Sequence, residues 1–339
     1  MKILIRATNW VGDAIMALPA LRAVRSRFSD AEITILARPY VAAIYRNQQV
    51  CDNMMFVDDQ RNMMAELRAR KFDVALLLQN AFQAAWLAWR SGIPERIGYA
   101  RDGRGLLLTK AVPVPRAGEI PVHEQYYYLE LLRRAGWLNA LPNESFIKLA
   151  VPEEDRLRAA EFLRSTGSNP GNLRIAIGAG ASYGSAKCWP PERFAELANR
   201  LQTTASVDVI LFGTLAEAPV SSAIAAGMRR PPIDLTGKTS IADLPALLSQ
   251  CHLFIGNDSG AMHVAAAVGL PVVAVFGSTD PFGTAPVTPR CTIVKEKPYC
   301  SPCFLRRCPT DHRCMTRVTP GAVEFAARHW ISSAEVRPA

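Results

Sequence analysis

Short runs of β-branched and aliphatic residues alternate along this chain with segments of helical periodicity, and no other feature constrains its fold as strongly. Strand-like runs occupy residues 3–7, 33–37 and 73–78, and apolar residues at helical spacing fill 14–28 and 122–135. Strands that alternate with helices are typical of βαβ units, whose strands form a parallel sheet. The first half of the chain is therefore predicted to be an α/β domain.

The same alternation starts again after a turn-rich stretch at 165–172, STGSNPGN, which is a candidate linker. A chain of 339 residues is long for one compact core and suits two domains of ordinary size. We therefore expect an α/β fold of two Rossmann-like domains, 1–165 and 166–339, that face a central cleft. A last helix at about 320–330 is expected to pack back on the first domain. The strands expected in the second domain lie at 173–179, 207–213, 252–256 and 271–277, with a helix at 192–202.

The balance of charge is basic, with 39 Lys and Arg against 30 Asp and Glu and a net charge of +9. Such a surplus suits an anionic partner, such as a phosphorylated sugar, a nucleic acid or an anionic membrane surface, and it is equally compatible with a solvated basic surface. Basic and aromatic residues do not interleave on a recognisable nucleic-acid-binding module, so nucleic acid is disfavoured as a partner.

No segment of the sequence has the pattern of a membrane span or a secretory signal. The most apolar stretch, residues 74–89, is interrupted by Gln79, Asn80 and Gln83, whereas a span needs about 20 consecutive apolar residues. The first residues, MKILIRATNWVGD, resemble a strand and lack the long apolar run of a signal peptide. We therefore expect a cytoplasmic protein.

Ligands of open α/β sheets bind beyond the carboxyl ends of the strands. This rule selects four candidate places, each just after an expected strand: 8–13, 178–189, 213–217 and 256–263. In NDSGAMHVAAAVGLPVVAVFG, residues 257–277, Gly260 allows a ligand close to the backbone of a helix N-terminus, which suits phosphate. His263 lies one helical turn after the cap and would reach the same ligand. A plain helix start with a core-facing histidine is the alternative. Three consecutive residues suit the cap: Asn257, Asp258 and Ser259.

A second candidate segment, GAGASYGSAKCWPPERFAEL at 178–197, runs from a strand into a loop of small residues. Ser182 can donate a hydrogen bond to a phosphate oxygen, and Lys187 supplies a positive charge. The segment is not a Walker loop, because GxxxxGK[ST] is absent. A lysine in a solvated loop is the alternative interpretation.

The third segment, ATNWVGDAIMALPAL at 7–21, places Gly12 and Asp13 at the turn before a helix. Asp13 can cap that helix, or it can act as a general base for a bound hydroxyl group. Two phosphate-type segments in the second domain and a carboxylate in the first together suggest a group transfer. A nucleoside-diphosphate donor would lie on the second domain and an acceptor on the first.

Six stretches follow a recognisable pattern: WVGDAIMALPAL (10–21), RIGYARDGRGLLLT (96–109), AKCWPPERFAEL (186–197), LTGKTSIADLPALLSQC (235–251), NDSGAMHVAAAVGLPVVAVFG (257–277) and CSPCFLRRCPTDHRCM (300–315). They resemble glycosyltransferase family 9, which has the GT-B fold, over nearly the whole length of the chain. The resemblance implies an inverting enzyme that moves L-glycero-D-manno-heptose from ADP-heptose to the first heptose of the lipopolysaccharide inner core. The acceptor would be lipid A-linked Kdo-heptose at the inner face of the inner membrane, which the protein would meet peripherally.

The resemblance also implies roles for individual residues. Asp13 would be the catalytic base, with Gly12 near the acceptor, and Lys187 would stabilise charge on the leaving diphosphate. Relatives of another branch have two threonines where this chain has Ser182 and Tyr183, so one hydroxyl donor becomes a phenol. No DxD-like pair follows a strand, so no metal is required for transfer. The implied donor-binding residues are Ser182, Lys187, Glu217, Thr236, Asp258, Ser259, Gly260 and His263.

Arg96, Arg101 and Arg104 are expected to form a basic loop on the first domain that binds anionic groups of the acceptor. A solvated loop is the alternative. The basic surplus of the chain would also favour contact with anionic lipid at the membrane surface.

Four cysteines crowd together at Cys300, Cys303, Cys308 and Cys314. Thiolates at such spacings can hold a structural zinc, although the spacing is less regular than in paired CxxC knuckles. A possible zinc site and a reduced loop with redox-sensitive thiols are both open. The implied reaction requires no cofactor at these residues.

Two other functions compete with this one. The first is another GT-B nucleotide-sugar transferase of cell-envelope glycan synthesis, with a different donor or acceptor. The second is a non-catalytic glycan-binding protein that retains the fold. The presence of Asp13, Lys187 and His263 together favours catalysis.

Overall fold

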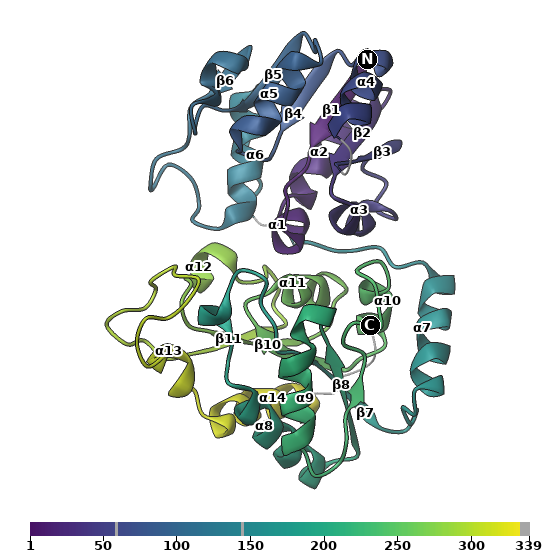
Figure 1. Ribbon diagram of the computed structural model, residues 1–339, viewed down its shortest axis with the longest axis vertical. Helices are drawn as coiled ribbons and strands as arrows, with labels where there is room; N and C mark the ends of the chain where they lie inside the picture. Colours follow the sequence, from purple (N-terminus) through teal and green to yellow (C-terminus); the bar gives the residue numbers. More distant parts are fainter. Residues whose placement is uncertain (58–59, 144–145, 333–339) are drawn as a thin grey trace. The chain divides into compact units, whose positions relative to one another are not determined.

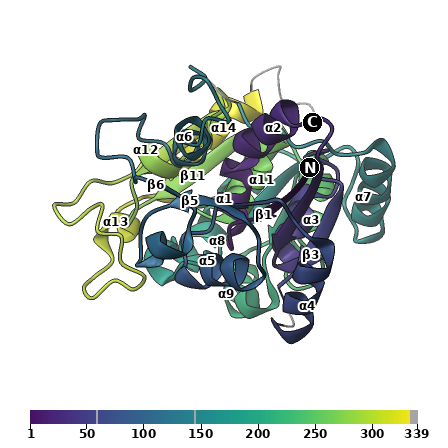
Figure 2. The ribbon, with the colours of Figure 1, turned by 90° about the horizontal axis from the view of Figure 1, so that it is seen from above.

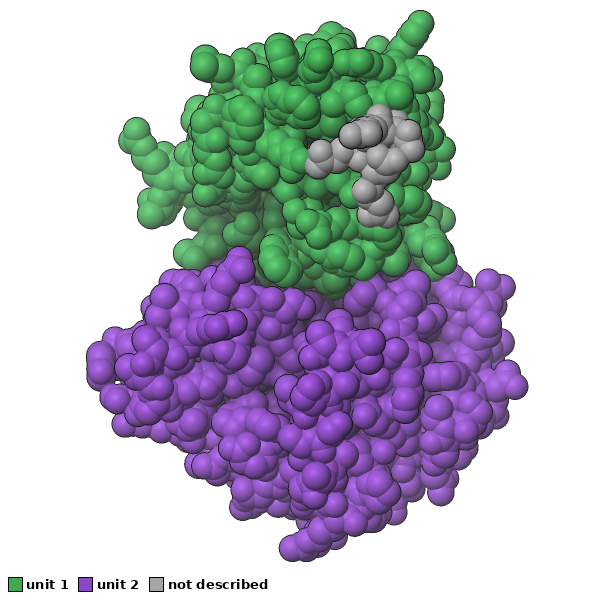
Figure 3. All heavy atoms as spheres, in the orientation of Figure 1, with its two compact units in different colours: residues 1–145 green, residues 146–339 purple. Residues whose placement is uncertain are grey.

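The computed structural model describes residues 1–57, 60–143 and 146–332 (Figure 1). The chain forms two compact units, Met1–Ser145 and Phe146–Ala339, which Figure 3 shows in different colours. The division lies earlier than the boundary at 165 expected from the linker-like composition. The reason is that helix α7 (Glu153–Ser165) packs on α10 (Leu244–Ser249) and therefore belongs to the second unit.

The first unit is built on a six-stranded parallel sheet with the order β3-β2-β1-β4-β5-β6, which confirms the predicted α/β architecture. The residues of β1 after Lys2 and all residues of β4 are buried, as expected for central strands that helices cover on both faces. Helices α2 and α6 pack against each other (Figure 2). The strands are β1 (Lys2–Arg6), β2 (Glu32–Ala37), β3 (Asn53–Phe56), β4 (Val74–Leu77), β5 (Glu95–Tyr99) and β6 (Lys110–Val112).

The helix predicted over 14–28 is in fact two helices, α1 (Val11–Met16) and α2 (Leu18–Arg27). Pro19 stands in the first turn of α2, where its missing N–H costs no hydrogen bond, and this favours a new helix start at that point. Because α1 begins at Val11, Asp13 lies inside the first turn of that helix and not before a helix. The other helices of the unit are α3 (Pro39–Tyr45), α4 (Gln60–Arg70), α5 (Phe82–Arg90), α6 (Glu124–Arg134) and the short 3-10 helix η1 (Arg104–Leu107).

The second unit has its own six-stranded parallel sheet, with the order β12-β11-β10-β7-β8-β9. All four strands predicted for this half are present. They are β7 (Leu173–Gly178), β8 (Val207–Phe212), β10 (Leu253–Asn257) and β11 (Val272–Phe276), with β9 (Ile233–Asp234) and β12 (Cys291–Lys295) at the two edges. The helical segments are α8 (Pro191–Thr204), α9 (Ala218–Gly227), α11 (Gly260–Ala267), α12 (Pro281–Thr284), α13 (Arg313–Thr316) and α14 (Pro320–Ser332), with the 3-10 turns η2 (Ser185–Lys187) and η3 (Leu215–Glu217).

The last helix, α14, packs within the second unit, and its expected contact with the first domain stays a prediction. Val323 and Ala327 on α14 are fully buried in the core of the second unit, against α8 and the strands β10 to β12. Trp330 adds a hydrogen bond from its indole N–H to the Thr292 hydroxyl on β12, at 3.0 Å. The apolar face of α14 therefore completes the core of its own unit. No helix of the described residues is both long and apolar enough to span a membrane.

Candidate active site

The carboxyl ends of the strands in the second unit bring three of the predicted segments next to one another. Strands β10, β7 and β8 are neighbours in the sheet, and the segments 256–263, 178–189 and 213–217 follow them in that order. Ligands of open α/β sheets bind at this edge. The sequence-based choice of these segments is therefore matched by their common position.

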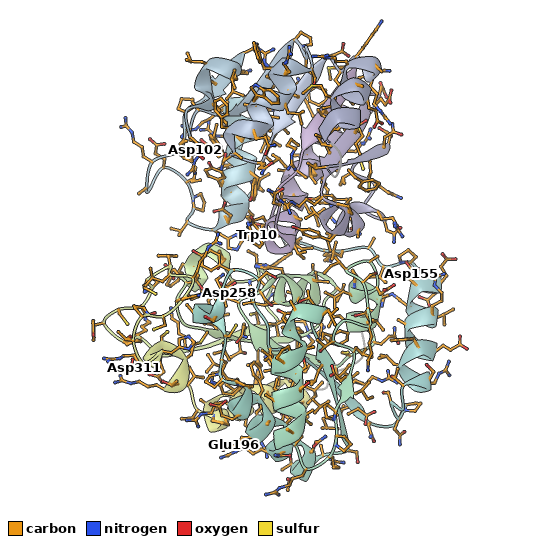
Figure 4. All side chains as sticks on the ribbon, in the orientation of Figure 1. Trp10, Asp102, Asp155, Glu196, Asp258 and Asp311 are labelled. Carbon is orange, nitrogen blue, oxygen red and sulfur yellow. The ribbon has the colours of Figure 1, made fainter. Side chains whose placement is uncertain are left out.

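Lys187 and Asp258, which are 71 positions apart in the sequence, form a buried ion pair at this edge. The Lys187 ammonium lies 2.6 Å from Asp258 Oδ2, and the two side chains are 12% and 5% exposed. The hydroxyl of Thr279 donates to the same carboxylate oxygen at 2.7 Å. Figure 4 labels Asp258 at this place in the second unit. The carboxylate thus fixes the position of the lysine, and Thr279 is a member of the cluster that the sequence did not reveal.

Asn257 ties the loop after β7 to the end of β10. Its side-chain amide donates to the carbonyl of Ala179 at 2.6 Å and accepts from the backbone N–H of Trp189 at 3.0 Å. Trp189 is itself fully buried, and its indole N–H donates to the carbonyl of Val318. The sequence alone suggests only a helix cap for Asn257. Its structural role is to hold both ends of the loop that carries Lys187.

Of the three candidate caps, Ser259 is the residue that caps α11. Its hydroxyl accepts from the N–H of Met262 at 3.5 Å, and Gly260 is the first residue of the helix. The first turn of such a helix offers backbone N–H groups to an anion. His263 is buried one turn further in, so its imidazole is not on the surface, and its contact with a donor stays a prediction.

Glu217 joins the segment after β8 to the loop after β7. Its Oε2 accepts from the N–H and the hydroxyl of Thr214, at 2.6 and 3.0 Å, in a reciprocal cap of η3. The other oxygen stands over Gly180, where any Cβ would collide with the carboxylate. Ser182 is exposed on the same loop. Thr236, by contrast, is buried, and its hydroxyl is engaged with that of Ser221 at 2.6 Å.

In the first unit Asp13 faces acidic and phenolic side chains. Glu124 and Tyr128 lie one turn apart on α6, and the negative charge of Asp13 acts on both of them. Burial, and after it the charge of Asp13, raises the pKa of Glu124 to about 7. Burial likewise raises the pKa of Tyr128 far above its ordinary value. Asp13 therefore belongs to a pair of carboxyl groups, and the sequence did not single out Glu124 because an acidic residue in the first turn of a helix is ordinary.

The expected basic loop of three arginines does not exist as such. Arg104 is fully buried, and its guanidinium donates to the carbonyls of Tyr99 and Gln79 and to the side chain of Asn80. Burial lowers the pKa of Arg104 to about 10. Arg104 holds together the chain segments that follow β4 and β5, so it is a core residue and not a surface contact for an acceptor.

Arg96 is also occupied by the protein backbone, since its Nε donates to the carbonyl of Leu107 at 2.7 Å. Arg101 alone of the three is substantially exposed, at 45% of its side chain. It lies 3.4 Å from the Tyr127 hydroxyl and 3.5 Å from Asp102, which Figure 4 labels. Of the expected acceptor-binding arginines, Arg101 is therefore the one that is placed to meet a ligand.

The cysteine-rich segment carries free thiols. Burial raises the pKa of Cys314 to about 11, and the neighbouring Cys303, Cys300 and Cys308 add to the shift. Hydrogen bonds from Thr310 lower the pKa of Cys308. Within residues 1–57, 60–143 and 146–332 no three His, Cys, Asp or Glu side chains converge in a way that could hold a metal ion. The possible zinc site stays a prediction.

A hollow at the surface of the first unit is not part of this site. It is lined by residues that include Met1, Asp73, Glu95 and Lys110, which lie at the amino-terminal ends of the strands. The candidate residues lie beyond the carboxyl ends, where ligands of such sheets bind.

Comparison with known proteins points to one family. The sequence model of the family described as "Glycosyltransferase family 9 (heptosyltransferase)" matches residues 60–313. Lipopolysaccharide heptosyltransferase 2 of Escherichia coli (strain K12) is 28% identical over 313 residues, 87% of this chain and 88% of that protein. Lipopolysaccharide heptosyltransferase 3 of the same strain is 40% identical over 286 residues, 79% of this chain and 80% of that protein. The solved structure of E. coli ADP-heptose lipopolysaccharide heptosyltransferase II matches with a TM-score of 0.83 and 25% identity over 98% of both chains.

Proposed function

The chain belongs to glycosyltransferase family 9, the heptosyltransferases, and from this premise we propose that it transfers heptose from ADP-heptose to the first heptose of the lipopolysaccharide inner core. The α/β fold of two Rossmann-like units agrees with the GT-B fold of its relatives. The observation that carries the proposal is the buried cluster of Lys187, Asp258 and Thr279 beside the start of α11. It is a site for an anionic leaving group in a chain whose relatives use ADP-heptose.

Asp13 is proposed to act as the base of an inverting displacement. A hydroxyl of the acceptor attacks the anomeric carbon of the donor, and the bond from that carbon to the diphosphate oxygen breaks. The proton of the hydroxyl passes to the Asp13 carboxylate as the new glycosidic bond forms. ADP leaves with the electron pair, and the configuration at the anomeric carbon is inverted.

Lys187 and the N-terminus of α11 are proposed to stabilise the charge that grows on the departing diphosphate. Preorganised positive groups in a partly buried site are effective in this role, because they need no reorganisation as the charge develops. Asp258 and Thr279 hold the ammonium group in place. ADP is a good leaving group, so no general acid and no metal ion is needed. Ser182, Glu217, Ser259, Gly260 and His263 would complete the contacts to the donor.

Arg101 is the residue best placed to bind anionic groups of the acceptor, a lipid A-linked Kdo-heptose. Because the acceptor is anchored by lipid A, we propose that the protein works in the cytoplasm, peripherally at the inner face of the inner membrane. The net charge of +9 favours contact with anionic lipid there.

The test is the release of ADP from ADP-heptose, with and without an inner-core acceptor that carries one heptose. We expect release that depends on the acceptor and falls about 10²- to 10⁴-fold in Asp13→Asn, while binding of ADP is unchanged. Release from another nucleotide-sugar would replace the proposed donor. Tight glycan binding without release from any donor would indicate a non-catalytic protein.

A second acceptor is favoured by the 40% identity to lipopolysaccharide heptosyltransferase 3. The donor and the chemistry would be the same, and the acceptor core would already carry a second heptose. Comparing the two acceptors in the same assay separates these functions, since kcat/KM will be higher for the natural one.

A further inference from the structure

We propose that Arg306, on the cysteine-rich segment, is a further donor-binding residue that contacts the diphosphate of the nucleotide-sugar beside Lys187. The inference rests on the proposed function, because it extends the same donor site. It also gives a role to the cysteine-rich segment, residues 300–315, which the transfer mechanism described above does not use.

The cysteine-rich segment is fastened to the loop that carries Lys187. The hydroxyl of Tyr183 donates to the carbonyl of Phe304 at 2.7 Å, and the N–H of Ala186 donates to the carbonyl of Arg306 at 3.0 Å. The His312 imidazole lies 3.0 Å from the carbonyl of Ala186. Gly184 allows this close approach, since any Cβ there would collide with the Arg306 carbonyl. The loop and the segment therefore form one structural element.

The same segment is also anchored beside the residue that supports Asp258. The N–H groups of Cys303 and Phe304 donate to the carbonyl of Ser278 at 3.1 and 2.7 Å. The hydroxyl of Ser301 donates to the carbonyl of Gly277 at 2.7 Å. Thr279, the next residue after Ser278, holds the Asp258 carboxylate. The segment thus reaches both sides of the ion pair between Lys187 and Asp258.

Two cations are brought to one aromatic ring by this arrangement. The Lys187 ammonium lies 4.9 Å from the centroid of the Tyr183 ring, and the Arg306 guanidinium carbon lies 5.3 Å from the same centroid. Both distances are in the range of cation–π attraction, which holds each group near the ring. Tyr183, the residue that replaces a second threonine hydroxyl, therefore serves to position positive charge.

The charges at this ring are not balanced by the protein. Asp258 neutralises Lys187, whereas Arg306 forms no ion pair with any of the residues that the structure describes. Because Lys187 is already paired, the guanidinium of Arg306 is the net positive charge at the ring, and a bound anion would balance it. A guanidinium presents a fork of donors that matches two phosphate oxygens, which a lysine cannot do. The ligand chemistry that fits is a diphosphate.

The side chain of Arg306 is free to vary without loosening the segment. It is exposed, and the contacts that fasten this residue to the loop come from its backbone carbonyl. Replacement of the side chain therefore leaves those hydrogen bonds in place. Arg307, the next residue, is also exposed and has no contact with the Tyr183 ring, which makes it a matched control.

The experiment measures the Kd of ADP, AMP and adenosine by calorimetry for the full-length wild type, Arg306→Met and Arg307→Met. Methionine keeps much of the length and the apolar packing of arginine and removes its charge. We expect Arg306→Met to weaken ADP binding about tenfold or more, as for the loss of a charged hydrogen bond. AMP should be affected less and adenosine not at all, while Arg307→Met should match the wild type.

Unchanged ADP binding in Arg306→Met would overturn the inference, and so would an equal loss for ADP and adenosine, which would mean that the side chain only supports the loop. The same measurement with UDP and uridine separates the two proposals. If the wild type prefers UDP to ADP, the proposed donor is wrong, while a selective loss of diphosphate binding in Arg306→Met would still uphold Arg306. If the wild type binds neither diphosphate, both proposals fail.

Discussion

Beyond the second sheet, the side chains that meet are a lysine, an aspartate and a threonine, whereas beyond the first sheet they are two carboxyl groups and a buried tyrosine. The positive charge of Lys187 is fixed by a buried partner before any ligand arrives. The charge of Asp13 instead opposes the ionisation of Glu124. We propose that the first of these regions binds an anion and that the second exchanges a proton.

The largest effect should follow from breaking the anion-binding region. Lys187→Met leaves the Asp258 carboxylate buried with only the Thr279 hydroxyl as a partner. We expect kcat to fall about 10²- to 10³-fold, and the free energy of unfolding to fall by about 3 kcal/mol because a buried charge loses its partner. Steady-state kinetics and urea unfolding measure the two effects.

A double variant separates the two consequences of that change. Lys187→Met with Asp258→Asn removes both charges, so most of the lost stability should return while activity stays low. Recovery of activity in the double variant would show that Lys187 acts only by neutralising Asp258. In that case Lys187 would not stabilise the leaving diphosphate, and the cluster in the second unit would not be an anion-binding region.

The next effect concerns the arginines of the first unit, where the structure separates a core residue from a surface residue. Arg104→Met removes three buried hydrogen bonds, and we expect a loss of about 3 kcal/mol in the free energy of unfolding. Arg101→Met, the exposed counterpart, should leave Tm unchanged at pH 4.5, where Glu124 is protonated, and raise the KM for the acceptor about tenfold. If Arg104→Met instead raises the KM for the acceptor and leaves stability unchanged, Arg104 binds the acceptor, as the sequence-based prediction of a basic loop requires.

These arginines also show how far the sequence could predict the molecule. The strand pattern predicts a sheet in each half of the chain and candidate segments after β1, β7, β8 and β10. It can do so because a strand is recognisable from its own run of β-branched and aliphatic residues. Lys187 and Asp258 were each identified, but their pairing was not, because it depends on strands β7 and β10 being neighbours in the sheet. Arg104 looked like an exposed loop residue, since its partners lie on segments that only the folded sheet brings together.

The same reason applies to two other features of the structure. Glu124 becomes unusual because the fold buries it and places near it the charge of Asp13, which lies on a helix far earlier in the chain. The burial of α14 depends likewise on the fit of Val323 and Ala327 to α8 and three strands of its own unit. Local patterns predict which elements are present, and they do not predict which distant surfaces those elements cover.

A smaller effect, on the pH dependence of stability, is expected from the pair of Asp13 and Glu124 in the first unit. Burial and the charge of Asp13 raise the pKa of Glu124 from its ordinary value to about 7, so ionisation of Glu124 opposes folding. The wild type should therefore lose stability as the pH rises from about 4.5 through 7, by on the order of 1–2 kcal/mol in this partly exposed setting. Glu124→Gln removes that loss, so its Tm should exceed that of the wild type at pH 8.5 and match it at pH 4.5.

The groups that surround Glu124 set the control for this measurement. Asp13 opposes its ionisation, while Arg101 favours it, so Arg101→Met should raise the pKa of Glu124 further and steepen the loss of stability with pH. A pH response of Glu124→Gln equal to that of the wild type would mean that the carboxyl pair does not titrate as proposed.

The smallest effect is expected from removal of metal ions. Neither the cluster of Lys187, Asp258 and Thr279 nor the pair of Asp13 and Glu124 needs a metal in the proposed transfer. Acceptor-dependent ADP release should therefore keep its full rate in the presence of EDTA. Elemental analysis of the same protein tests the possible zinc at Cys300, Cys303, Cys308 and Cys314 separately. One zinc per chain that is lost in Cys308→Ser would establish a structural site, and its absence would leave a reduced segment. If instead EDTA abolishes transfer and zinc restores it, the metal supports the loop to which the cysteine-rich segment is fastened, and the anion-binding region is not preformed by protein groups alone.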